Sequence, residues 1–119
     1  MVLSDRYVDS SIAYQAYGRG LGDMVAQVNA IATGGLVPDL TVFLDLPPAV
    51  GMARKQQEEN HELDRLEQEK LEFHQKVYEG YDALCKKELE RICRIDASGT
   101  IEEVFGQIKA ALDELLDRA

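Results

Sequence analysis

Apolar and polar positions alternate along the chain in blocks that predict strands and helices in turn. Leu40–Leu46 and Ile92–Ala97 are short, mostly apolar runs, as expected of buried strands in a parallel sheet. Pro47 and Pro48 end the first run, and Pro48 suits the first turn of a helix. Met1–Ser4 has the composition of the last residues of another buried strand. The pattern therefore predicts three strand segments separated by helices.

Two helical stretches are predicted between the first two strand segments. The first begins near Asp9 or Ser10, either of which can accept hydrogen bonds as an N-cap. Glycines near position 20 interrupt it, and Gly34 with Gly35 ends its continuation as a left-handed cap. The apolar stripe of this continuation is formed by Met24, Val28 and Ile31.

Three further helices complete the pattern. A short helix is predicted from Ala49 to about Lys55, and a long one ends near Glu90. The stripe of the long helix contains Leu66, Phe73, Val77, Tyr81 and Leu84, whose aromatic members we interpret as core. The last helix, Ile101 to about Asp117, begins at a capping box of Thr100 and Glu103. Its predicted inner face consists of Val104, Ile108, Ala111 and Leu115. Alternating strands and helices predict an α/β fold with right-handed crossovers.

Composition narrows the classes of partner. The 119 residues carry a net charge of −9, which argues against binding to nucleic acid or to an anionic membrane. A phosphate ligand is still compatible with this charge, because it needs a few placed arginines rather than a basic surface. Cys85 and Cys93 lack metal-binding spacing and are interpreted as reduced thiols. No apolar run is long enough to span a membrane, so we expect a soluble, cytoplasmic protein.

The chemistry is concentrated in residues 5–20, where a strand is predicted to give way to a helix. In open α/β sheets, ligands bind at this kind of junction. Arg6 offers a forked donor suited to a phosphate, and Asp5 can orient it or a metal-bound water. Ser11 and Gln15, four residues apart, share a helix face, and Tyr14 flanks them with a ring. The combination predicts a nucleotide pocket.

The segment DRYVDSSIAYQAYGRG resembles the Asp-Arg-Tyr segment of bacterial thymidylate kinases. Further segments match in the same order, namely Ala32–Leu36, Pro38–Thr41, Val50–Arg54, Asp64–Glu67 and Leu71–His74. The resemblance implies a P-loop-kinase-like parallel sheet with flanking helices and strand order 2-3-1-4-5. The family begins with a Gly-rich phosphate loop ending in Gly-Lys-Ser/Thr, which this sequence lacks. We therefore expect a truncated domain, in which residues 1–119 supply strands 3, 4 and 5.

The resemblance also implies a reaction, the ATP-dependent phosphorylation of dTMP to dTDP in dTTP biosynthesis, with Mg²⁺ accompanying ATP. Arg6 would bind the acceptor phosphate, and Asp5 would support it or the water shell of the metal, with no residue assigned as a direct metal ligand. The implied dTMP-binding residues are Arg6, Ser10, Ser11, Tyr14 and Gln15. The implied ATP-binding and lid residues are Arg54, Arg65 and Glu67, with the lid at 55–65.

Three interpretations stay open at this point. The first is a thymidylate kinase homologue that is inactive as this chain alone, because the phosphate loop is missing. The second is a related nucleoside or nucleotide kinase. The third is a non-catalytic acidic fragment or interaction module. The expected partners are dTMP and ATP, together with either a second copy of the chain or a separate N-terminal segment.

Overall fold

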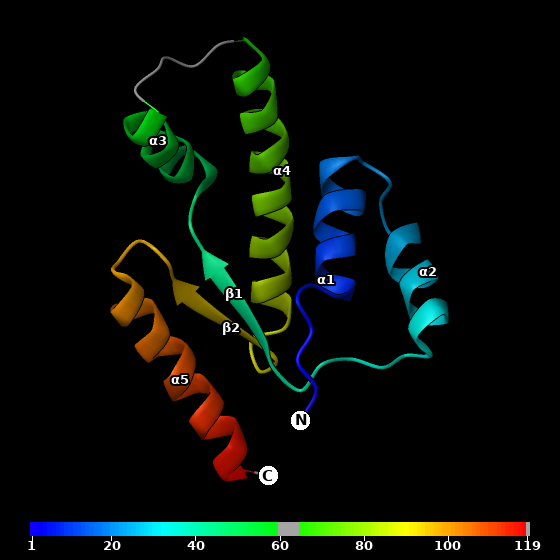
Figure 1. Cartoon of the computed structure of the whole chain (residues 1–119). Helices are drawn as coiled ribbons and strands as arrows, with labels where there is room; N and C mark the ends of the chain where they lie inside the picture. Colours follow the sequence, from blue (N-terminus) through cyan, green and yellow to red (C-terminus); the bar gives the residue numbers. More distant parts are fainter. Residues whose placement is uncertain (60–64, 119) are drawn as a thin grey trace. The chain divides into compact units, whose positions relative to one another are not determined.

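The computed structural model describes residues 1–59 and 65–118, with the backbone alone described for 55–59 and 65–67. The chain forms two compact units, considered separately below. The helical unit comprises Met1–Val37 and Pro47–Leu84, and the sheet unit comprises Pro38–Leu46 and Cys85–Ala119. The described elements are α1 (Val8–Ser11), the π-helix η1 (Ile12–Gly18), α2 (Met24–Thr33), β1 (Thr41–Asp45), α3 (Pro48–Glu59), α4 (Arg65–Lys87), β2 (Ile92–Asp96) and α5 (Ile101–Arg118) (Figure 1).

In the sheet unit, β1 pairs with β2 in parallel, with Thr41 opposite Ile92 and Asp45 opposite Asp96. This confirms the predicted pairing and the α/β class, with a small parallel sheet and flanking helices. On β2, Ile92 and Ile95 are 5% and 2% exposed; they are three residues apart and so point to opposite faces of the strand, each of which is covered at one of them. The two apolar runs pair because each supplies backbone donors and acceptors that the other satisfies.

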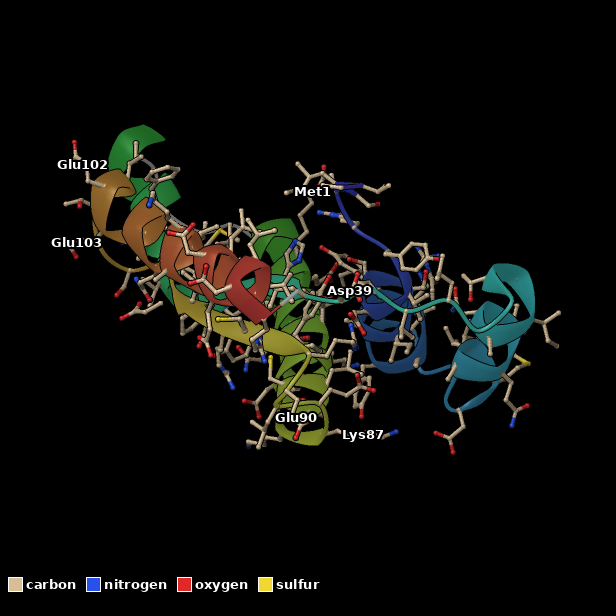
Figure 2. All side chains as sticks on the ribbon, turned by 90° about the horizontal axis from the view of Figure 1, so that it is seen from below. Met1, Asp39, Lys87, Glu90, Glu102 and Glu103 are labelled. Carbon is tan, nitrogen blue, oxygen red and sulfur yellow. The ribbon has the colours of Figure 1, made fainter. Side chains whose placement is uncertain are left out.

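The α5 helix follows β2, and the side-chain amide of Gln107 on α5 hydrogen-bonds to the last residue of β2. Gln107 donates a hydrogen bond to the Asp96 carbonyl (3.1 Å) and accepts one from the Asp96 amide (3.2 Å). Thr100 caps the helix, because its hydroxyl accepts from the Glu103 amide at 3.2 Å. Figure 2 shows Glu102 and Glu103 on the first turn, where negative charge favours a helix. The predicted inner face is partly buried, namely Val104, Ile108, Ala111 and Leu115.

The predicted strand at Met1–Ser4 is wrong. These residues form no strand in the structure, and the side chains of Met1, Val2 and Leu3 are more than nine-tenths exposed. An apolar composition makes a strand only when a neighbouring strand satisfies its backbone groups, and within the described residues β1 and β2 pair with each other alone. The apolar run β1 is also less covered than predicted, since Leu44 is 52% exposed.

The helical unit confirms the predicted end of α2 but not the burial of its stripe. Gly34 adopts φ +64° and closes α2 as a left-handed cap. Val25 is buried, whereas the predicted stripe is exposed, most strongly Ile31 at 84%. Periodicity identifies the helix correctly but does not reveal which surface covers its apolar face. Among the described residues, no helix has the length and apolar character that crossing a membrane requires.

Candidate functional site

The first helical segment of the chain lies beside α4 in the helical unit (Figure 1). Its first turn, α1, follows the extended residue Tyr7 and has no side-chain cap. Asp9 and Ser10 were expected as N-caps, and this expectation is wrong because both lie inside the helix. The Ser10 hydroxyl instead shares a hydrogen bond of 2.6 Å with the hydroxyl of Tyr81 on α4. The Ser10 hydroxyl therefore makes a tertiary contact with α4 in place of the predicted cap of its own helix.

The segment then widens into η1, the π-helix that carries Tyr14 and Gln15. The Arg19 amide donates to the Tyr14 carbonyl at 3.0 Å, five residues back, and the Leu21 amide donates to the Gln15 carbonyl at 3.0 Å. π-Helical turns are rare and occur frequently at functional sites. Tyr14 and Gln15 thus sit in an unusual stretch of backbone, which supports their assignment to a site.

Arg6 precedes α1 in a conformation that L-residues seldom adopt. Its φ is +70°, the left-handed region, where a non-glycine residue costs on the order of 1–3 kcal/mol. The Ser4 hydroxyl donates to the Arg6 carbonyl at 2.9 Å. The guanidinium carbon lies 5.3 Å from the centroid of the Tyr14 ring, within the range of a cation–π contact. The turn at Arg6 therefore directs its charge back over the helix that follows.

Tyr81 contacts this segment through its hydroxyl, although the sequence pattern assigned it only to the core. Burial raises the pKa of its hydroxyl, and the hydrogen bond shared with Ser10 opposes this rise. The charge of Arg6 also lowers this pKa, while Tyr14 and Asp9 raise it. The direct contact of the Tyr81 hydroxyl is with Ser10. Asp9 is itself only 7% exposed.

Close packing holds the two helices of the site together. A Cβ atom at Gly80 would lie 2.9 Å from the Tyr17 ring, and one at Gly18 would lie 2.9 Å from Phe73. These distances are too short for real carbon atoms, so a side chain at either position would force its neighbour to shift. The ring of Phe73 also lies 6.1 Å from that of Tyr14, centroid to centroid. The helix pair is therefore a defined frame on which the candidate side chains stand.

The structure brings together some of the predicted site residues and not others. Arg6 lies over the Tyr14 ring, and Ser10, on the same segment, is hydrogen-bonded to Tyr81. Ser11 and Gln15 are half-buried on the same helical segment. The remaining predicted residue of this stretch, Asp5, is exposed beside Arg6.

The predicted ATP side of the site is described less completely. Arg54 lies on α3 and is exposed. The side chains of Arg65 and Glu67 lie outside the described residues. Most of the predicted lid at 55–65 does so as well, although the helix α3 extends into its first part, through Glu59. An open hollow of about 420 Å³ lies at the turn between α4 and β2, and none of the residues lining it was predicted to bind a ligand.

Among residues 1–54 and 68–118, whose side chains the structure describes, no group of three or more His, Cys, Asp or Glu side chains could hold a metal ion. Mg²⁺ in phosphoryl-transfer sites is commonly held by one or two carboxylates, waters and nucleotide phosphates. A single exposed carboxylate such as Asp5 fits that donor set.

Comparison with known proteins gives consistent matches. Residues 1–108 match the family model described as Thymidylate kinase. A thymidylate kinase from Lactobacillus delbrueckii is 55% identical over 120 residues, which cover 97% of this chain and 57% of the relative. One from a Synechococcus species is 48% identical over 100% of this chain and 56% of the relative. One from Latilactobacillus sakei is 54% identical over 90% of this chain and 50% of the relative. The chain thus spans about half the length of the curated relatives it matches.

Proposed function

The chain belongs to the thymidylate kinase family, and on that premise we propose that the protein transfers the γ-phosphoryl group of ATP to dTMP. An oxygen of the dTMP phosphate attacks the γ-phosphorus, the bond to the bridging oxygen of ADP breaks, and dTDP and ADP leave. Such transfer depends mainly on positioning and on neutralising charge. This chain contributes the side that holds the acceptor.

The observation that carries the proposal is the placement of Arg6. Its left-handed backbone and its contact with Tyr14 direct a permanent charge over the helical segment that carries Ser11 and Gln15. Within the described residues, Arg6 takes part in the ring contact but in no ion pair, so its forked donors suit an incoming phosphate. Strain held at one arginine is typical of functional sites.

The residues around Arg6 have separate parts in acceptor binding. Ser11 and Gln15 read the edge of the thymine, because hydroxyl and amide groups both donate and accept hydrogen bonds. Tyr14 borders the sugar and favours a deoxynucleotide. Ser10 contributes a hydroxyl to the same surface, at the turn that follows Arg6.

The donor side of the reaction involves fewer residues of this chain. Arg54 lies against the adenine, and Arg65 with Glu67 acts at the exit of the lid at 55–65. Asp5 would support Arg6 or a water of Mg²⁺, and the metal, when bound, would neutralise charge on the ATP phosphates. Because the sequence contains no Gly-Lys-Ser/Thr phosphate loop, we expect the 119-residue chain alone to be inactive.

The test uses two proteins: the 119-residue chain, and a joined protein in which this chain follows the phosphate-loop segment of the Lactobacillus delbrueckii relative. A coupled ADP-release assay should detect dTMP phosphorylation by the joined protein and none by the chain alone. Calorimetric titration of the joined protein with dTMP, dUMP, dCMP and dGMP should show a preference for dTMP. Gln15→Ala should reduce that preference, because it removes a group that reads the base edge.

Each outcome discriminates between the interpretations. A preference for another monophosphate would favour a related nucleotide kinase. A well-folded joined protein that binds none of the four nucleotides would contradict the proposal and leave the interaction module.

A further inference from the structure

Resting on this proposed function, we propose that Tyr81 is a positioning residue of the acceptor site, acting through the hydroxyl of Ser10. The hydrogen bond between the two hydroxyls is 2.6 Å long and joins α4 to the first turn of α1. That turn has no side-chain cap of its own, so the contact with Tyr81 is a tertiary interaction that adds to its backbone hydrogen bonds. Arg6 lies just before Tyr7, the N-cap of this turn, and Tyr14 follows one turn after Ser10.

The neighbouring glycine explains how Tyr81 reaches Ser10. Gly80 allows the ring and Cβ of Tyr17 to come within 2.9–3.0 Å of the position that a Cβ would occupy. The two helices therefore approach closely at this point of α4. With the helices this close, the half-buried Tyr81 side chain can place its hydroxyl on Ser10. The Gly80–Tyr81 pair thus serves as a docking point for the segment that carries the acceptor residues.

The surroundings of Tyr81 are polar, unlike those of the other members of its stripe. Val77 and Leu84 on the same face are 4% and 9% exposed and have no hydrogen-bonding side chain. The Tyr81 hydroxyl, in contrast, is influenced by the charges of Arg6 and Asp9. A phenylalanine would fill the same volume, so the hydroxyl is the feature that requires an explanation. Positioning of Ser10 and, through α1, of Arg6 provides one.

The experiment is a double-mutant cycle in the joined protein, measured as dTMP affinity by calorimetry. Tyr81→Phe keeps the ring and removes the hydroxyl, and it should weaken dTMP binding roughly two- to tenfold, as loss of one neutral hydrogen bond implies. In a Ser10→Ala background the same change should have no further effect, because its partner is already absent. Tyr17→Phe is the matched control, since Tyr17 packs through its ring and is 45% exposed. It should leave dTMP affinity unchanged.

The pattern of the cycle distinguishes positioning from a purely structural role. If Tyr81→Phe lowers only the melting temperature and leaves dTMP affinity equal to wild type, the positioning role is overturned while the proposed function stands. Additive losses in the double variant would also overturn it. If Tyr81→Phe does not fold, Tyr81→Met with and without Ser10→Ala repeats the cycle. Failure of the wild-type joined protein to bind dTMP overturns the proposed function and this inference together.

Discussion

The two units begin their helices in opposite ways. In the sheet unit, α5 starts at a side-chain cap from Thr100, and none of its residues is fully buried. In the helical unit, α1 starts without a side-chain cap, yet Asp9 in it is buried and Ser10 is tied to α4. The α5 helix is therefore defined largely by local interactions, and α1 by tertiary ones. Local interactions such as the cap of α5 can be recognised in a sequence, whereas the tertiary contact of α1 cannot. The tertiary contact can, however, adjust the position of a binding residue on α1.

The two arginine–aromatic contacts differ in the same sense. Arg94 lies 5.7 Å from the Phe43 ring centroid and also donates to the Asp45 carboxylate at 2.7 Å, linking β2 to β1. Arg6 lies over Tyr14 without an ion pair in the described part of the chain. The charge of Arg94 is neutralised within the fold by the Asp45 carboxylate. The Tyr14 ring does not neutralise the charge of Arg6, which can therefore pair with an anionic ligand.

The largest expected effect separates these two arginines. In the joined protein, Arg6→Ala should weaken dTMP binding about ten- to a hundredfold, because a charge-assisted contact contributes about 1.5–3 kcal/mol. Arg94→Ala should leave dTMP affinity within about twofold and lower stability by at most about 1 kcal/mol, since its ion pair is partly exposed. Calorimetric titration and urea unfolding measure the two quantities. Similar dTMP affinities for the two variants would remove the distinction.

The next effect concerns two glycines inside helices. Gly80→Ala should destabilise the fold by about 1–2 kcal/mol, because the new methyl group meets the inner atoms of Tyr17 and the overpacking outweighs the gain in helix propensity. Gly106→Ala on α5 is the control. Nothing lies within 4 Å of its Cβ position, so it should stabilise by about 0.5–1 kcal/mol. Urea denaturation gives both values, and stabilisation by both changes would show that the helix pair is not tightly packed.

A smaller loss is expected from the cap of α5. Thr100→Ala should cost about 1 kcal/mol, because it removes the acceptor for the Glu103 amide. Asp23→Ala provides the comparison, since Asp23 is the N-cap of α2 and makes no side-chain cap hydrogen bond. Its effect should be close to zero. Equal losses in thermal unfolding would mean that the local definition of α5 does not depend on Thr100.

The smallest effect is a shift in an exposed titration. The side-chain hydroxyl of Ser98, followed by its amide, donates to Asp96 and lowers the pKa of that carboxyl. A lowered pKa in the folded state adds stability above the unfolded-state pKa, and this stability is lost as pH falls through the folded-state value. Ser98→Ala should raise the pKa of Asp96, so that the stabilisation is smaller and its loss is complete at a higher pH. NMR titration checks this, with Ser98→Thr, which keeps the hydroxyl, expected to retain the lower value.

The sequence predicted the parts of the fold that depend on local pattern. The two apolar runs that form β1 and β2 and the partly buried face of α5 were identified because periodicity reports burial directly. The cap at Gly34 follows from the freedom of glycine to adopt a positive φ. The strand at Met1–Ser4 was wrong because an apolar run does not reveal whether a neighbour exists to pair with it.

The candidate site was predicted less completely, for a related reason. Arg6 and Tyr14 could be named from residue type and spacing, but their contact depends on a left-handed turn at an arginine, which no pattern indicates. The π-helix η1 has no periodic signature over so short a stretch. Tyr81 was assigned to the core because its helix stripe is apolar, and the hydroxyl contact with Ser10 has no local signal.

The pairing of Ser10 with Tyr81 also affects when the acceptor side can assemble. The two residues are 71 positions apart, and Arg91 on the sheet side reaches Thr41 across 50 positions. Helices form locally in about a microsecond, whereas contacts between distant residues must first close a long loop. During synthesis at about 5–20 residues per second, roughly 4–14 s pass between the addition of Ser10 and that of Tyr81. The residues proposed to bind the acceptor are thus translated early, but the contact between Ser10 and Tyr81 can form only after α4 has been synthesised.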